Sequence, residues 1–178
     1  RFAPKVLRDV SHVETRCEIL GAAANLPFVI APTGGTGFSW PDGDVALARA
    51  AKAFGIPCTL STATTATVEH IAEQAGGRLW FQLYVLHNRD YTEKLVARAA
   101  AAGCEALVIT ADLATGGKRE RDFRNHFEVP FRLGLTHILQ ACTKLHWSWN
   151  VVTRGVPAFE NLRGLVPPGK ASAEAIAS

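Results

Sequence analysis

The chain has 178 residues, of which 48% are hydrophobic and 20% are charged. This composition is typical of a folded globular protein and not of a disordered one. Its 19 Lys and Arg residues against 16 Asp and Glu residues give a net charge of +3, too small and too evenly spread to favour nucleic acid as a partner. The sequence contains no apolar run of about 18 residues that could cross a membrane, and its first residues lack the order of a secretory signal.

The four cysteines do not form a C-x-x-C pair, and those at 58 and 104 lie in apolar surroundings. We therefore expect reduced, partly buried thiols in a cytoplasmic protein. The six histidines show no metal-type spacing with one another or with the cysteines, so we expect no metal site.

Taken in chain order, residues 1–26 form a polar segment that we expect to be irregular. From residue 27, short apolar runs alternate with helical patterns. The runs predicted as strands are 27–31, 57–61, 79–85 and 106–110. The segments predicted as helices between them are 45–54, 67–74 and 90–102. Short apolar strands separated by helices predict a parallel sheet of the α/β class, built from right-handed βαβ units.

Two parallel architectures compete, an open doubly wound sheet and half of an eight-stranded (β/α)8 TIM barrel. Polar residues follow or end each predicted strand, among them Thr33, Ser61, Gln82 and Thr110. A barrel builds its active site at the carboxyl ends of several strands, whereas a doubly wound sheet concentrates it at one switch point. This pattern favours the barrel, of which the chain supplies about the first four βα units, over residues 27–125.

We expect residues 126–178 to form a long loop or insert followed by a flexible end. Before it, residues 116–124 are predicted to be a charged loop. Within it, residues 130–152 carry apolar side chains at helical spacing with two tryptophans beyond them, and residues 164–178 are rich in Gly, Pro, Ala and Ser.

Several residues could bind a ligand, although each has a plainer explanation. The glycine-rich turn at 32–37 lets a ligand approach the backbone closely, but a simple strand-to-helix turn would need it too. Gln82 and Tyr84 lie two apart on one strand and so face the same side. An arginine in the 118–122 cluster could hold a carboxylate, or the whole cluster could be solvated. Asp112 could orient a histidine base or act only as a cap.

Taken together, these segments resemble one family. They are LeuArgAspValSer at 7–11, IleAlaProThrGly at 30–34, TrpProAspGlyAsp at 40–44, LeuSerThr at 60–62, PheGlnLeuTyrVal at 81–85, ThrAlaAsp at 110–112 and ArgGluArgAspPheArgAsn at 119–125. In this order they resemble the FMN-dependent L-2-hydroxy-acid oxidases and dehydrogenases, a family that includes glycolate oxidase, flavin lactate dehydrogenases and mandelate dehydrogenase. The resemblance implies a (β/α)8 barrel with FMN at its carboxyl mouth, and an oxidoreductase that converts a small 2-hydroxy acid to the 2-keto acid.

The resemblance also implies roles for individual residues. The backbone of Pro32, Thr33 and Gly34 would lie along the flavin. The side chains of Ser61, Gln82 and Thr110 would hydrogen-bond its ring. Three further residues would act near the substrate. Tyr84 would contact the substrate carboxylate or hydroxyl, and Arg119 would help hold the carboxylate. Asp112 would stabilise a protonated catalytic histidine.

The family's catalytic histidine, its main carboxylate-binding arginine and its phosphate-binding residues belong to the second half of the barrel. We therefore expect a second polypeptide that supplies the C-terminal half-barrel, and a homo-oligomer of the completed barrel. The insert at 130–152, with cations beside tryptophans, suggests peripheral contact with the cytoplasmic membrane. The alternatives are a catalytically silent half-barrel that acts as a binding or assembly partner, and an FMN enzyme with another substrate.

Overall fold

The computed structural model describes residues 6–111, 120–124, 139 and 141–163. Its centre is a parallel sheet of β3 (Cys58–Ser61), β4 (Leu79–Tyr84) and β5 (Ala106–Thr110), in that spatial order. The segment predicted as the first strand lies beside β3 but pairs with it through one parallel bridge, between Ile30 and Cys58. Each unit is thus added beside the preceding one, as in the wall of a parallel barrel.

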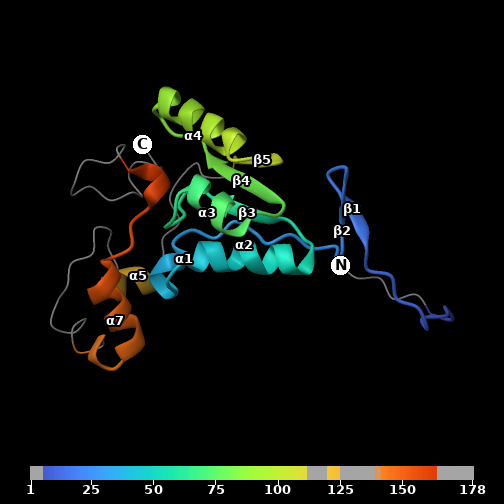
Figure 1. Ribbon diagram of the computed structural model, residues 1–178, viewed down its shortest axis with the longest axis horizontal. Coiled ribbons are helices and arrows are strands. Elements are labelled where there is room, and N and C mark those ends of the chain that lie inside the picture. The colour runs from blue at the N-terminus through green and yellow to red at the C-terminus, as the bar shows by residue number, and fades with distance from the viewer. Residues whose placement is uncertain (1–5, 112–119, 125–138, 140, 164–178) are drawn as a thin grey trace.

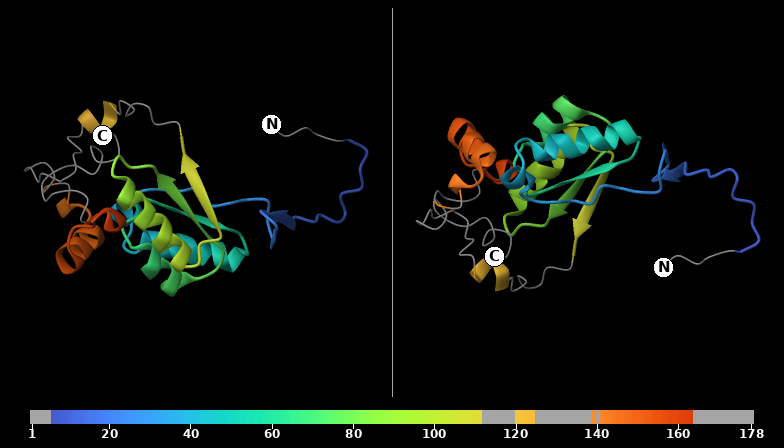
Figure 2. Two further views of the ribbon diagram at one scale, coloured as in Figure 1. Left: turned by 90° about the horizontal axis from the view of Figure 1, so that it is seen from above. Right: turned by 90° about the horizontal axis from the view of Figure 1, so that it is seen from below.

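Three helices follow the strand segments and cover one face of the sheet (Figures 1 and 2). They are α2 (Gly43–Phe54), α3 (Val68–Ala75) and α4 (Arg89–Ala101). The predicted helices agree with them to within two residues because local signals set their ends. Thr67 caps α3 by accepting from the His70 N–H, Asn88 caps α4 by accepting from the Tyr91 N–H, and Gly55 ends α2 with φ 64°.

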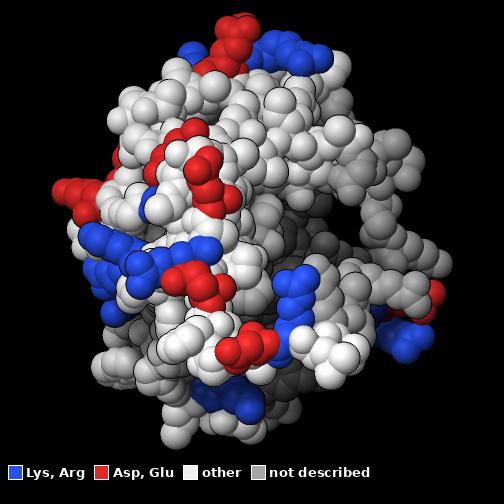
Figure 3. Space-filling view, turned by 90° about the vertical axis from the view of Figure 1, so that its right-hand side faces the viewer, with Lys and Arg blue, Asp and Glu red and all other residues white. Residues whose placement is uncertain are grey.

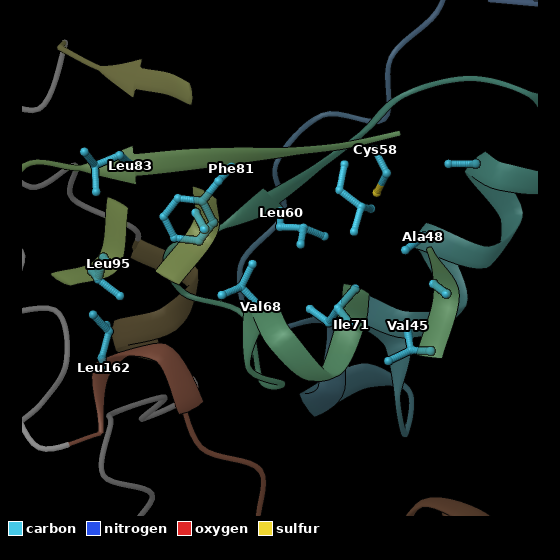
Figure 4. Close-up of a cluster of buried hydrophobic side chains, with 14 of the residues drawn as sticks. Val45, Ala48, Cys58, Leu60, Val68, Ile71, Phe81, Leu83, Leu95 and Leu162 are labelled. Carbon is cyan, nitrogen blue, oxygen red and sulfur yellow. The ribbon is translucent and has the colours of Figure 1, made fainter. Parts of the chain in front are cut away.

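The hydrophobic core lies between these helices and the sheet, as Figure 4 shows. Phe81 from β4 and Val68 and Ile71 from α3 are fully buried there. Burial of each such side chain contributes roughly 1.5–3 kcal/mol. This layer fixes the positions of the loops that leave the carboxyl ends of β3 and β4.

The last strand of the described sheet, β5, is covered less completely than its neighbours. Leu107 pairs with Phe81 and Ile109 with Leu83, so all four side chains project toward the helix-covered face. Phe81 and Leu83 are buried, whereas Leu107 is 41% and Ile109 59% exposed.

The N-terminal segment contains more structure than the expected irregular stretch. Strands β1 (Cys17–Ile19) and β2 (Ala22–Ala24) form a short antiparallel hairpin. Arg78 holds this hairpin by donating to the carbonyls of Ile19, Ala22 and Ala23. It also pairs with Glu105 at 2.9 Å. Residues 6–16 extend away from the sheet (Figures 1 and 2).

The remaining elements are short helices, namely α1 (Thr36–Ser39), α5 (Glu120–Arg124), α7 (Leu145–Arg154) and the 3-10 turn η1 (Glu160–Leu162). The prediction of a loop at 116–124 is wrong over α5, where Glu120 and Arg124 form an i, i+4 pair. Helix α7 packs on α1 and on the segment that follows it. The Trp147 Nε1–H donates to the Phe38 carbonyl at 2.8 Å, and Arg154 pairs with Asp42 at 2.7 Å.

Figure 3 shows basic and acidic side chains interspersed on one face of the molecule. In the described part of the chain, no helix is both long and apolar enough to cross a membrane. All four cysteines are free thiols.

Candidate active site

Polar side chains from three adjacent strands meet at the carboxyl ends of β3, β4 and β5. Ser61 and Gln82 are register partners on neighbouring strands, and both are buried. The Ser61 hydroxyl donates to Gln82 Oε1 at 3.2 Å, and Gln82 Nε2 donates to the Thr110 hydroxyl at 2.7 Å. The structure therefore joins the three residues that the resemblance predicts as flavin ligands into one hydrogen-bonded row.

This row retains hydrogen-bonding capacity for a ligand. An amide carries two N–H groups and a hydroxyl both donates and accepts. Within the described residues, no hydrogen bond uses the second amide hydrogen of Gln82 or the hydroxyl hydrogen of Thr110. A ring edge that alternates carbonyl oxygens and nitrogens, as the isoalloxazine of FMN does, matches such a donor and acceptor set.

Tyr84 lies beyond Gln82 on the same strand and the same face, half-buried at the end of β4. It is the register partner of Thr110 on β5. The predicted substrate-contacting residue therefore stands next to the predicted flavin-binding row, at the open end of the sheet.

The turn at 32–34 lies against the loop that leaves β3. Gly35 N–H donates to the Ala63 carbonyl at 2.9 Å. A Cβ added to Gly34 would lie 3.1 Å from the Ala63 Cβ and 3.7 Å from Ser61 Oγ. Pro32, Thr33 and Gly34 are themselves exposed. The structure thus presents their backbone beside the polar row, with a glycine at the point of closest approach.

A buried carboxylate that is not among the predicted site residues holds the end of the glycine-rich turn, at Thr36 and Gly37. Asp44, in the first turn of α2, accepts from the Thr36 hydroxyl, the Thr65 N–H and the Thr65 hydroxyl. The Thr65 hydroxyl in turn accepts from the Gly37 N–H at 3.1 Å. A Cβ on Gly37 would lie 2.1 Å from that hydroxyl oxygen, so only glycine fits there. The TrpProAspGlyAsp segment was the signal that could have identified Asp44.

A second buried polar residue, Asn161, comes from the region expected to be a loop or flexible end. Its Oδ1 accepts from the Val68 N–H at the start of α3, and its Nδ2 donates to the Thr64 hydroxyl. Its carbonyl accepts from the Tyr91 hydroxyl at 2.6 Å. These contacts fasten η1 to the β3–α3 loop and α4. No local sequence pattern predicts them, because the partners lie at least 70 residues away along the chain.

Two predicted site residues, Asp112 and Arg119, lie outside the described residues. Burial and, to a smaller extent, the charge of Asp44 raise the pKa of the Cys58 thiol to about 11, so this cysteine is a neutral thiol at pH 7. In the described segments, no three His, Cys, Asp or Glu side chains converge as metal ligands would.

Comparison with known proteins gives a family match over nearly the whole chain. The model of the FMN-dependent dehydrogenases matches residues 1–176. An (S)-mandelate dehydrogenase of Pseudomonas putida is 44% identical over 161 residues, which cover 90% of this chain and 41% of that protein. An L-lactate dehydrogenase of Bartonella tribocorum is 40% identical over 153 residues, or 86% of this chain and 40% of the relative.

Solved structures agree with the sequence matches. The crystal structure of a monotopic membrane protein, (S)-mandelate dehydrogenase, superposes with a TM-score of 0.85 at 42% identity, covering 99% of this chain and 46% of that one. A mandelate oxidase variant with (S)-mandelic acid gives a TM-score of 0.66 at 41% identity, covering 75% and 38%. The predicted barrel is confirmed, and the chain spans less than half the length of these relatives.

Proposed function

The chain belongs to the FMN-dependent dehydrogenase family, and from this premise we propose that it supplies the flavin-facing half of an enzyme that oxidises an L-2-hydroxy acid to the 2-keto acid. The observation that carries the proposal is the hydrogen-bonded row of Ser61, Gln82 and Thr110 beside the turn at 32–34. The substrate class is a mandelate- or lactate-like acid, since the matched relatives carry these names.

The described residues would bind and orient the cofactor. Gln82 and Thr110 donate to the ring edge, Ser61 supports the Gln82 amide, and the backbone at 32–34 lies along the ring face. FMN, when bound, supplies an acceptor for the two electrons and the hydrogen removed from the substrate Cα. The buried position of Ser61 and Gln82 keeps water from competing for these hydrogen bonds.

We assign the substrate to the side of the row where Tyr84 stands. Its phenol would donate a hydrogen bond to the carboxylate or hydroxyl of the acid. Arg119 would add a charge-assisted bond to the carboxylate. Asp112 would stabilise the protonated form of a histidine base that takes the hydroxyl proton. These last two roles rest on the family resemblance of the segments around them.

We also propose that a second polypeptide carries the C-terminal half-barrel, with the histidine base and the remaining strands. Three features support a missing neighbour. Leu107 and Ile109 on β5 are largely exposed, and the buried Trp80 Nε1 has no hydrogen-bond partner within the described residues. The extended arm at 6–16 also exposes apolar side chains, Val10 and Val13 among them. Completed barrels would then associate as a homo-oligomer.

The proposal is tested by co-producing this chain with the C-terminal half of the Pseudomonas putida relative. We expect a complex with flavin absorption that bleaches on adding L-mandelate or L-lactate, and not on adding D-mandelate. Gln82→Leu should weaken FMN binding at least about tenfold, the value of one good hydrogen bond. Gln74→Leu, on the exposed face of α3, is the matched control and should bind FMN normally. A stable but colourless complex would instead indicate a silent half-barrel.

We also propose peripheral contact of helix α7 with the cytoplasmic face of the membrane. Its apolar stripe consists of Leu145, Trp149 and Val152, which lie on one helix face and are 76%, 69% and 79% exposed. The opposite side of α7 is held to the barrel through Trp147 and Arg154. A stripe that is fixed in place and faces outward suits insertion into a lipid surface. The likeness to a monotopic membrane protein supports the same reading.

Sedimentation with phosphatidylglycerol vesicles tests this contact. We expect the wild-type chain to sediment with the vesicles and the double variant Trp149→Ser, Val152→Ser to stay in the supernatant. Phe54→Ser, which removes an exposed aromatic side chain at the end of α2, should not change sedimentation. Equal sedimentation of all three proteins would exclude the stripe as the membrane contact.

A further inference from the structure

The ladder between β3 and β4 ends at Ser61, which pairs with Gln82, and the next residue, Thr62, is fully buried. The Thr62 hydroxyl donates to the Gln82 carbonyl at 2.7 Å and accepts from the Tyr84 N–H at 3.1 Å. Its own N–H donates to Gln82 Oε1 at 3.3 Å. All three hydrogen bonds of Thr62 therefore go to two residues of the candidate site.

The hydroxyl takes the place of a backbone pair. Had the parallel ladder continued, the N–H of residue 62 would bond the carbonyl of 82, and its carbonyl would receive the N–H of 84. One hydroxyl performs both functions, because it donates and accepts at once. The chain can thus leave the sheet at Thr62 while β4 continues straight to Tyr84, with its buried backbone groups satisfied.

We propose that Thr62 is a positioning residue for the reaction, an inference that rests on the function proposed above. Its hydroxyl fixes the β4 backbone between Gln82 and Tyr84, and so fixes the distance between the flavin-binding amide and the substrate-binding phenol. Its N–H attracts Gln82 Oε1, so that Nε2 is directed toward Thr110 and the ring edge. Thr62 sets the geometry of both contacts without touching either ligand.

Thr64 provides a matched control two residues further along the same loop. It is also buried, and its hydroxyl also both donates and accepts, to the Ala66 carbonyl and from Asn161 Nδ2. Neither partner belongs to the candidate site. A valine at either position keeps the shape of the side chain and removes one doubly bonded hydroxyl.

The experiment compares Thr62→Val, Thr62→Ser and Thr64→Val in the chain assembled with the C-terminal half-barrel. For Thr62→Val we expect kcat/KM for L-mandelate to fall about tenfold, mostly through KM, and FMN to bind about tenfold more weakly, as for a hydrogen bond lost in a buried site. Thr62→Ser should restore both values to within about twofold of the wild type. Thr64→Val should lower the thermal midpoint without changing KM.

Hydrogen exchange at the Tyr84 amide reads the same contact without substrate or cofactor. We expect it to accelerate in Thr62→Val and to stay slow in Thr62→Ser and Thr64→Val. A wild-type assembly without FMN or activity would contradict the proposed function, while the exchange result would still decide whether Thr62 holds the strand. An active wild type in which Thr62→Val behaves like Thr64→Val, in exchange and in KM, would overturn the inference.

Discussion

Strands β4 and β5 are neighbours in one sheet, yet their helix-facing side chains meet different surroundings. On β4, Phe81 and Leu83 are buried under α3 and α4. On β5, the register partners Leu107 and Ile109 remain largely exposed. The amino-acid types do not explain this difference, because all four side chains are large and apolar. What differs is that α3 and α4 cover the side chains of β4, whereas no described element fully covers those of β5.

The contrast separates the polar part of the candidate site from the apolar face of β5. The polar part of the site is held in position by this chain. Gln82 is bonded to Ser61 on one side and to Thr110 on the other, and Asp44 and Thr65 hold Thr36 and Gly37 at the end of the glycine-rich turn. On β5, by contrast, the helix-facing side chains Leu107 and Ile109 remain exposed. The described residues therefore form the polar row by themselves but do not complete the apolar layer over β5.

The largest expected effect separates the two strands directly. Leu83→Ala should destabilise the chain by about 2–5 kcal/mol, since it leaves a cavity in a packed core. Leu107→Ala removes the same atoms from an exposed position and should change the stability by no more than about 0.5 kcal/mol. Urea unfolding of the isolated chain measures both values.

The same pair of variants also tests the missing neighbour. In the assembly with a C-terminal half-barrel, Leu107→Ala should become destabilising by about 1–3 kcal/mol if a new element covers the side chain. An unchanged effect of Leu107→Ala in the assembly would show that β5 is not the strand at which the two halves meet.

A smaller effect is expected at Asp44, whose hydrogen bonds to Thr36 and Thr65 hold the end of the glycine-rich turn. Asp44→Asn keeps the size of the side chain but places an amide hydrogen or a neutral oxygen against the donors of Thr65 and Thr36, and should cost about 1–3 kcal/mol. Asp42→Asn, two residues away, breaks an exposed ion pair with Arg154 and should cost less than about 1 kcal/mol. Thermal unfolding compares the two. Equal losses of stability would mean that the hydrogen bonds of Asp44 contribute no more than an exposed ion pair.

The sequence predicted the parts of the fold that local signals determine. Helices α2, α3 and α4 were found because apolar side chains recur at helical spacing in each of them and a glycine follows each one closely. The hairpin β1–β2 was missed because its strands are three residues long and depend on Arg78, more than 50 residues away. Likewise, the first strand segment shows a single bridge at Ile30, although its apolar run suggested a longer pairing.

The candidate site divides in the same way. Ser61, Gln82, Tyr84 and Thr110 could be identified because strand ends and the two-residue alternation place them on one face. Thr62 and Asn161 could not, because their roles depend on which distant donors and acceptors reach them. The sequence alone does not show which donor or acceptor will form a hydrogen bond with a buried threonine or asparagine.

The smallest expected effect lies on the finished outer layer, where α3 and α4 are joined by Glu69 and Arg98. The Arg98 guanidinium binds both oxygens of Glu69, at 2.6 and 2.8 Å, and this hydrogen bonding lowers the pKa of the Glu69 carboxyl below its ordinary value of 4.5. Because the pKa of Glu69 is lower in the folded than in the unfolded chain, the stabilisation is present above about pH 5 and is lost as the pH falls through the folded value.

The Glu69–Arg98 pair is partly exposed to solvent, so its contribution to stability should not exceed about 1 kcal/mol. Glu69→Gln should therefore lower the thermal midpoint slightly at pH 7 and by less at pH 3, whereas Glu93→Gln, at an exposed position of α4, should have no effect at either pH. A midpoint difference for Glu69→Gln that does not shrink as the pH falls would show that packing of the side chain, and not its charge, joins the two helices.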